Sequence, residues 1–304
     1  MTSQQSESNE AEKLKTLRIL NPYPNIYAYY DGRTGHRYHS DKPNWLDNGA
    51  FTLGVASYSI ISNDEALIFD AHITVQHAAA VLRHVHSLGV TKVSVVYSHA
   101  HTDHIAGARA FKDCTIISSE GTASRIEKNR EKLGAIDPPI DAVVPDKTFS
   151  GQLDLQIGHV HVELHSFNIH TSDSIILWIP SLRLLFAGDT LEDTATYIAE
   201  AANLPLHQKE LQRMKASFAT DKILPAHGDP DRIAGGGYDV SFIDATVRYI
   251  AAMTEDVEQP VAWRKSLQEV VAGDIGSGSL IYYEQYEDVH KENVDAIRAV
   301  RKNA

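Results

Sequence analysis

The stretch His99-Ala100-His101-Thr102-Asp103-His104 carries three imidazoles and one carboxylate within six consecutive residues, directly after the apolar run over residues 93–97. Histidine and aspartate are ligands of zinc and of similar divalent metals. In an extended segment His99 and His101 point to the same side, so they can bind one ion. Asp103 and His104 follow, where we expect a helix over residues 105–111, and they can bind a second ion. The spacing predicts a metal site rather than a polar loop that happens to be rich in histidine.

Two further polar side chains follow apolar runs downstream. Asp189 comes after residues 183–186, in the segment Phe-Ala-Gly-Asp-Thr, and His227 comes after residues 223–225, in the segment Pro-Ala-His-Gly. Each segment is typical of a strand, a turn of small residues and a polar side chain at the tip. Active sites are often built from such tips, because a rigid sheet holds them in place.

In this order the motifs resemble those of the metallo-β-lactamase superfamily, over about residues 60–230. The resemblance implies a four-layer αββα sandwich, an α/β fold, and a cofactor of two zinc ions per chain. It implies one metal site made by His99, His101 and His170. It implies a second metal site made by Asp103, His104 and His227, with Asp189 bridging the two ions.

His170 departs most from the superfamily pattern. The usual form is Gly-His-Thr-Pro-Gly-Ser, whereas residues 169–174 read Ile-His-Thr-Ser-Asp-Ser. His159, His161 and His165 lie nearby, but their spacing of two and four residues is typical of one face of a half-exposed strand. We assign the ligand to His170 because it follows that strand instead of lying in it.

The two-metal site predicts a hydrolase. Two divalent cations about 3.5–4 Å apart can share a bridging water and lower its pKa toward ~7, so that hydroxide attacks a carbonyl at neutral pH. One metal would stabilise the developing oxyanion. Asp103 is the expected catalytic residue, which orients the nucleophile and relays a proton to the leaving group. We expect the substrate to be a lactam or lactone, that is, a cyclic amide or ester of a small metabolite or xenobiotic.

Three aromatic residues are candidates for substrate contact. Residues 31–52 form a long loop that contains Trp45 and Phe51, and long loops in compact domains are usually functional. Such a flap favours a partly apolar or ring-shaped substrate, although the loop could instead pack its own aromatics together. Tyr197 lies eight residues after Asp189. Homoserine-lactone hydrolases of the superfamily often carry a Tyr shortly after that Asp.

Two alternative functions remain open within the resemblance. A thioester hydrolase of the glyoxalase II type would hold glutathione with basic residues near the C-terminal helices. The basic residues present there are Arg248, Arg264 and Lys265, and no diagnostic pattern joins them. A persulfide dioxygenase would hold a single iron with the counterparts of His99, His170 and Asp189. The identity of the metal distinguishes zinc hydrolase from iron dioxygenase.

Composition excludes several partners. With 28 Lys and Arg against 40 Asp and Glu, the formal net charge is −12, which opposes the phosphate neutralisation that nucleic-acid binding requires. No apolar run approaches the ~20 residues that span a bilayer, so we expect no membrane attachment. The polar N-terminus does not read as a secretory signal, and we expect a cytoplasmic protein with a small-molecule substrate. The single cysteine, Cys114, excludes an intramolecular disulfide.

The remaining pattern predicts the domain organisation. We expect a disordered leader over residues 1–15, a catalytic domain over 16–237 and a helical segment over 238–304 packed on it. The expected strands cover residues 26–30, 56–61, 66–69, 93–97, 115–117, 160–164, 175–179 and 184–187. The expected helices cover residues 74–88, 122–132, 207–217, 241–254, 260–271 and 281–300. The C-terminal helices could cover the rim of the active site or form the contact of a homodimer, and the sequence does not choose between these roles.

Overall fold

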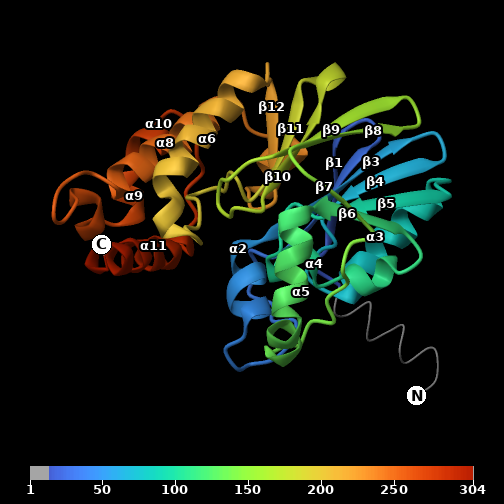
Figure 1. Ribbon diagram of the computed structural model, residues 1–304, viewed down its shortest axis with the longest axis horizontal. Helices are drawn as coiled ribbons and strands as arrows, with labels where there is room; N and C mark the ends of the chain where they lie inside the picture. Colours follow the sequence, from blue (N-terminus) through green and yellow to red (C-terminus); the bar gives the residue numbers. More distant parts are fainter. Residues whose placement is uncertain (1–13, 304) are drawn as a thin grey trace. The chain divides into compact units, whose positions relative to one another are not determined.

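The computed structural model describes residues 14–303, so the leader expected over residues 1–15 lies almost wholly outside the described residues. The chain divides into two compact units. The first extends to Gly151 and includes Leu155–His161, and the second comprises Gln152–Asp154 and the chain from Val162 onward. Figure 1 shows the first unit mainly in blue to green and the second in yellow-green to red.

A seven-stranded sheet forms the centre of the first unit, in the order β1-β2-β3-β4-β5-β6-β7. Its strands are β1 (Arg18–Tyr23), β2 (Ile26–Asp31), β3 (Val55–Ser62), β4 (Glu65–Phe69), β5 (Lys92–Val96), β6 (Thr115–Ser119) and β7 (Lys147–Phe149). Pairing is antiparallel from β1 to β4 and parallel from β4 to β7. The carboxyl ends of β4, β5 and β6 therefore meet at one edge, where side chains on the following loops can converge.

Helices cover the parallel part of this sheet through a shared apolar core. The helices of the unit are η1 (Leu46–Ala50), α2 (Phe51–Leu53), α3 (Val75–Ser87), α4 (Thr102–Ile105), η2 (Ala108–Phe111) and α5 (Glu120–Ala135). Buried side chains of α3, of α5 and of strands β4 to β6 form one cluster, among them Val81, Ile126, Ile68, Val95 and Ile116. Thr74 caps α3, because its Oγ1 accepts the His77 N–H at 3.2 Å.

The continuous helix expected over residues 105–111 is wrong. The chain instead forms the single turn α4, which starts at Thr102, and then the short 3₁₀ helix η2. Gly107 lies between them and donates its N–H to the carbonyl of His72 at 3.0 Å. A Cβ at this position would lie 2.1 Å from the carbonyl oxygen of Ala71, so only glycine allows this close approach.

The second sheet has five strands in the order β12-β11-β10-β9-β8. They are β8 (Gln152–Ile157), β9 (Val160–Ser166), β10 (Ile175–Ile179), β11 (Leu184–Gly188) and β12 (Lys222–Pro225). Strand β10 pairs antiparallel with β9 and β11, whereas β11 and β12 pair in parallel. The end of β11, the end of β12 and the start of β10 consequently lie at the same edge of this sheet.

The helices of the second unit gather mainly after β12, as the orange to red part of Figure 1 shows. They are η3 (Pro180–Leu182), η4 (Ala201–Asn203), α6 (Leu204–Ser217), α7 (Pro230–Ala234), α8 (Ser241–Met253), η5 (Val261–Arg264), α9 (Leu267–Val270), α10 (Ala272–Gly276) and α11 (Tyr286–Lys302).

Two of the C-terminal helices differ from expectation. The helix expected over residues 260–271 is split into η5 and α9, because Ser266 and Glu269 form a capping box that starts a new helix. The last helix begins at Tyr286 and not at residue 281. Residues before it bond elsewhere, since the Ile281 N–H donates to Asp193 and the Tyr283 N–H donates to Thr194.

The eight strands expected from the sequence are confirmed, with ends that differ by one or two residues. Strands β1, β7 and β8 were not expected. Within residues 14–303, no helix combines the length and apolar character that crossing a membrane requires.

Candidate functional site

The loop after β5 brings four of the expected ligands together within the first unit. His99 follows the strand closely, and His104 lies in the turn α4 that comes next. The ring centroid of His99 lies 4.5 Å from that of His101 and 4.3 Å from that of His104. Asp103 Oδ2 lies 3.6 Å from His104 Nε2. This arrangement is what the spacing predicts, and it comes from a strand end followed by one helical turn.

Asp70 fixes the orientation of His104. It directly follows β4, and the parallel register of Phe69 with Val96 places it beside Ser98. Its Oδ1 accepts the Ser98 N–H at 2.6 Å, and its Oδ2 lies 2.8 Å from Nδ1 of His104. Because an ionised carboxylate only accepts, the proton of the imidazole lies on Nδ1 and the lone pair on Nε2. His104 Nε2 is therefore the atom with a lone pair available to a metal, and it lies 3.6 Å from Asp103 Oδ2.

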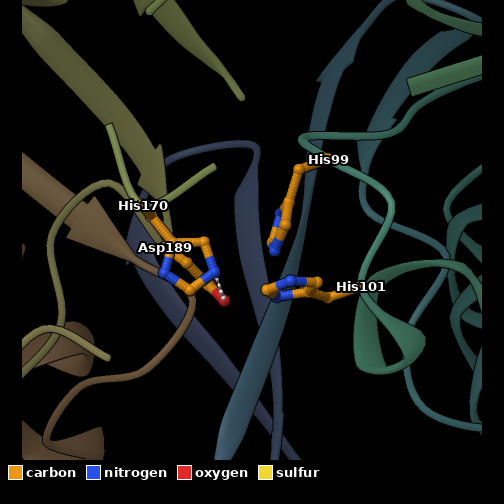
Figure 2. Close-up of side chains that lie close together, drawn as sticks. All are labelled: His99, His101, His170 and Asp189. Carbon is orange, nitrogen blue, oxygen red and sulfur yellow. Dashed lines mark ion pairs between the residues drawn. The ribbon is translucent and has the colours of Figure 1, made fainter. Parts of the chain in front are cut away.

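Ser98 contacts a second imidazole. Its Oγ lies 3.0 Å from Nδ1 of His99. Figure 2 shows the rings of His99 and His101 next to each other. The side chains of His99 and His104 are buried, whereas the Asp103 side chain is 15% exposed. Asp103 is thus the acidic group of this cluster that solvent can reach.

The second unit brings together His170, Asp189 and His227. Asp189 follows β11 and His227 follows β12, and the Ala226 N–H donates to the carbonyl of Gly188 at 2.9 Å across the parallel pair. The loop between β9 and β10 carries His170 to the same edge. Asp189 Oδ2 lies 3.6 Å from Nε2 of His170 and 3.5 Å from Nε2 of His227, the former drawn as a dashed line in Figure 2.

His170 has an unusual backbone conformation and a fixed tautomer. Its φ of 65° lies in the left-handed region, which costs of order 1–3 kcal/mol for a residue other than glycine and is often found at functional sites. Its Nδ1 lies 3.0 Å from the carbonyl oxygen of Tyr197. A carbonyl only accepts, so Nδ1 carries the proton and Nε2 the lone pair. His159, His161 and His165 lie in or beside β9, as the alternation predicts.

The separations of the donor atoms test whether a metal fits. Distances of 3.5–3.6 Å between Nε2 and carboxylate oxygens exceed an ordinary hydrogen bond. Two ligands bound ~2.0–2.1 Å from a tetrahedral zinc lie ~3.3–3.4 Å apart. Each unit therefore holds its carboxylate and imidazole donors at nearly the separation that a shared ion imposes, and His and Asp clusters that could bind metal are present in the chain.

The expected substrate contacts lie in different surroundings. Phe51 is 1% exposed and stacks on Tyr38, with ring centroids 5.6 Å apart. Trp45 is half-buried and donates its Nε1–H to the carbonyl of Pro138 at 2.8 Å. The stacking of Phe51 on Tyr38 favours the alternative that this loop packs its own aromatics. Tyr197 is 37% exposed. Burial, together with the carboxylates of Glu292 and Glu192, raises the pKa of its phenol.

The sequence interpretation missed three residues that hold the expected ligands. They are Asp70, Ser98 and Glu192, the last of which lies 3.5 Å from Nδ1 of His170. Asp70 carries a recognisable signal, since it directly follows an apolar strand as Asp189 does. Ser98 and Glu192 carry none, because only the fold brings them beside an imidazole.

Comparison with known proteins gives a consistent family. The model of the metallo-beta-lactamase superfamily matches residues 51–227, more than half of the chain. The chain is 25% identical over 176 residues to metallo-beta-lactamase type 2 of Bacteroides fragilis, covering 56% of this chain and 67% of that protein. It is 26% identical over 153 residues to hydroxyacylglutathione hydrolase of Methylococcus capsulatus, covering 49% and 54%. The chain thus spans about half the length of that hydrolase.

Solved structures show the same fold. The DIM-1 metallo-beta-lactamase matches with a TM-score of 0.61 at 16% identity, covering 78% of this chain and 98% of that one. The metallo-beta-lactamase from Pontibacter korlensis matches with a TM-score of 0.58 at 18% identity, covering 75% and 95%. These matches confirm the expected α/β class, with two sheets and helices as in the metallo-beta-lactamase sandwich.

Proposed function

This chain belongs to the metallo-beta-lactamase superfamily, and on that premise we propose that it is a dinuclear zinc hydrolase that opens a lactam or lactone ring. The superfamily comprises metal-dependent hydrolases, which supports the proposal that this chain is an enzyme. The observation that carries the proposal is the repeated donor geometry. In each unit an acceptor-only oxygen holds Nδ1–H of a histidine, and Nε2 of the same ring lies 3.6 Å from a carboxylate oxygen.

We propose that the seven expected ligands bind two ions. His99, His101 and His170 would hold one ion, and Asp103, His104 and His227 would hold the other. Asp189 would contribute to both. Its Oδ2 is shared at nearly equal distances by two imidazoles, which suits a bridging carboxylate. Support from Asp70 and from the carbonyl of Tyr197 would keep the rings oriented and the ligand atoms basic.

Bound zinc would supply a nucleophile from water at neutral pH and would polarise the substrate carbonyl. The protein residues then have separate tasks. Asp103, as the more exposed carboxylate, would orient the attacking water through its Oδ atoms and pass a proton to the departing nitrogen or oxygen. Asp189, which is 4% exposed, would act only as a ligand.

The similarity to a metallo-beta-lactamase supports a ring-opening reaction. A different relative supports a second candidate reaction. The match to hydroxyacylglutathione hydrolase favours a thioester hydrolase as the alternative. Both reactions use the same attack on a carbonyl carbon and differ in the leaving group. We propose a small-molecule substrate in either case.

Metal analysis and a substrate panel test the proposal together. The protein would be purified anaerobically, its metal counted per chain, and hydrolysis of a β-lactam, a homoserine lactone and a glutathione thioester compared at one protein concentration. We expect about two zinc ions per chain and fastest turnover of a lactam or lactone. If the thioester is turned over fastest, the proposed substrate class changes from a lactam or lactone to a thioester. One iron per chain, together with oxygen consumption when a persulfide is added, would overturn the proposal that the protein is a hydrolase.

A further inference from the structure

The loop after Asp189 contains a buried carboxylate that the proposed reaction does not use. Glu192 is 1% exposed, and its Oε1 accepts the Tyr197 N–H at 2.9 Å. The same oxygen lies 3.5 Å from Nδ1 of His170. A buried carboxylate is costly unless donors or opposite partial charges surround it. The Tyr197 N–H donates to this group, and the polarised Nδ1–H of His170 lies close enough to interact with it electrostatically.

Glu192 acts on His170 in two ways. Its bond to the Tyr197 N–H holds the backbone of the same residue whose carbonyl accepts Nδ1–H of His170 at 3.0 Å. Its negative charge beside Nδ1 also favours the tautomer with the proton on that nitrogen. Both effects leave the lone pair on Nε2 and make it a stronger metal ligand, as carboxylates behind zinc-bound histidines do.

Helix α11 and the residues before it hold this loop in place. Tyr286, at the start of α11, places its hydroxyl 3.4 Å from Oε2 of Glu192. Asn293, two turns further on, accepts the Ile198 N–H at 2.7 Å and donates to the carbonyl of Thr196 at 2.8 Å. These contacts lie on both sides of Tyr197, so its carbonyl is held from each direction.

We propose that Glu192 is a positioning residue that orients His170 for metal binding, and that α11 supports it through Tyr286 and Asn293. This inference rests on the proposed function, since it takes His170 as a metal ligand. It also gives the C-terminal helices a role in supporting the site. From the sequence alone, these helices could either cover the rim of the site or form a dimer contact.

Metal affinity of the full-length chain tests the assignment without any substrate. Zn²⁺ would be titrated against a competing chelator, and Co²⁺ would be added to report the ligands through its visible absorption. We expect Glu192→Gln, which keeps an acceptor for Tyr197 but removes the charge, to weaken binding by about 10-fold or more and to alter the Co²⁺ spectrum. Tyr286→Phe should weaken binding less, by about 2–5-fold.

Glu287→Gln is the matched control. This carboxylate lies in α11 and accepts the N–H groups of Leu267 and Gln268 at 2.8 and 3.1 Å and the hydroxyl of Tyr282 at 3.0 Å, none of which belongs to the loop after Asp189. We expect it to lower the melting temperature of the metal-depleted protein without changing metal affinity.

The outcomes separate the inference from the function on which it rests. The Glu192→Gln variant could melt at a lower temperature but bind metal as tightly as the wild type. This result would show that Glu192 has a purely structural role and would overturn the inference. If this variant does not fold, Tyr286→Phe decides, and unchanged affinity there overturns it. Wild-type protein that binds no metal overturns the proposed function itself.

Discussion

Replacing Asp70 by Asn should switch the tautomer of His104 and so weaken metal binding. Asp70 is 2% exposed and accepts from both the Ser98 N–H and Nδ1 of His104. In Asp70→Asn the amide oxygen can still accept from Ser98, but an NH₂ group then faces the imidazole. Nδ1 must become the acceptor, so the proton moves to Nε2. A protonated Nε2 cannot bind a metal.

The expected size follows from the bonds that are lost. A hydrogen bond to a charged group is worth about 1.5–3 kcal/mol. Changes behind a ligating histidine typically cost 10–100-fold in metal affinity, equivalent to about 1.4–2.7 kcal/mol. The two ranges agree, so we expect the dissociation constant of Zn²⁺ to rise by about 10–100-fold for the ion that His104 is proposed to bind.

Asp31→Asn provides a control with nearly the same geometry in the same unit. Asp31 is fully buried, and it accepts the Gly32 N–H at 2.7 Å and contacts Nε2 of His77 at 2.9 Å. Nδ1 of His77 lies 2.7 Å from Oγ1 of Thr74, and neither group belongs to the expected ligands. This variant should lose comparable stability in denaturant unfolding and retain zinc affinity to within about twofold.

Competition titration with a zinc chelator measures both variants. The reasoning is refuted if Asp70→Asn binds zinc as tightly as the wild type. It is also refuted if Asp31→Asn loses as much affinity, because the effect would then come from general weakening of the fold.

Further variants test other parts of the molecule. Asp103→Asn should lower kcat by about 10²–10⁴-fold with little change in the melting temperature of the metal-depleted protein, and unchanged kcat would contradict its proposed catalytic role. Phe51→Ala should lower the free energy of unfolding by about 3–5 kcal/mol in urea titration; a loss below 1 kcal/mol would show that the loop is not packed. Burial lowers the pKa of the His290 imidazole in the folded protein. Below pH ~6.5 this imidazole is therefore protonated in the unfolded chain but still neutral in the folded chain. Stability is then complete above that pH and falls by up to ~1.4 kcal/mol per pH unit below it, and His290→Gln, measured with metal removed, should show a shallower fall. Metal removal should lower the melting temperature, since zinc at 100 times its dissociation constant stabilises by about 2.7 kcal/mol, and zinc should restore it.

Part of the site was predictable because its signals are contiguous in the chain. The ligands from His99 to His104 lie in one short segment, and Asp189 and His227 each follow an apolar strand. Strand alternation and ligand spacing depend on neighbouring residues only, so they can be read without knowledge of the fold. The strands that were not expected are short or, in β1 and β8, alternate without a strong apolar run.

What the tertiary structure decided depends on residues far apart in the chain. Asp70 and Ser98 are separated by 28 positions, and only the parallel pairing of β4 and β5 makes them neighbours. The interruption of the helix between α4 and η2 was also decided there, since Gly107 lies against the carbonyl of Ala71 and donates its N–H to the carbonyl of His72.

The sequence by itself determined the superfamily motifs, the α/β class and the chemical nature of the expected ligands, because local patterns encode strands and donor atoms. Only the tertiary structure decided which partners orient those donors. Phe51 points into the core and Glu192 toward His170 because of packing and hydrogen bonds from distant segments. Loops have no periodicity that records side-chain direction, so a sequence gives their composition but not what they face.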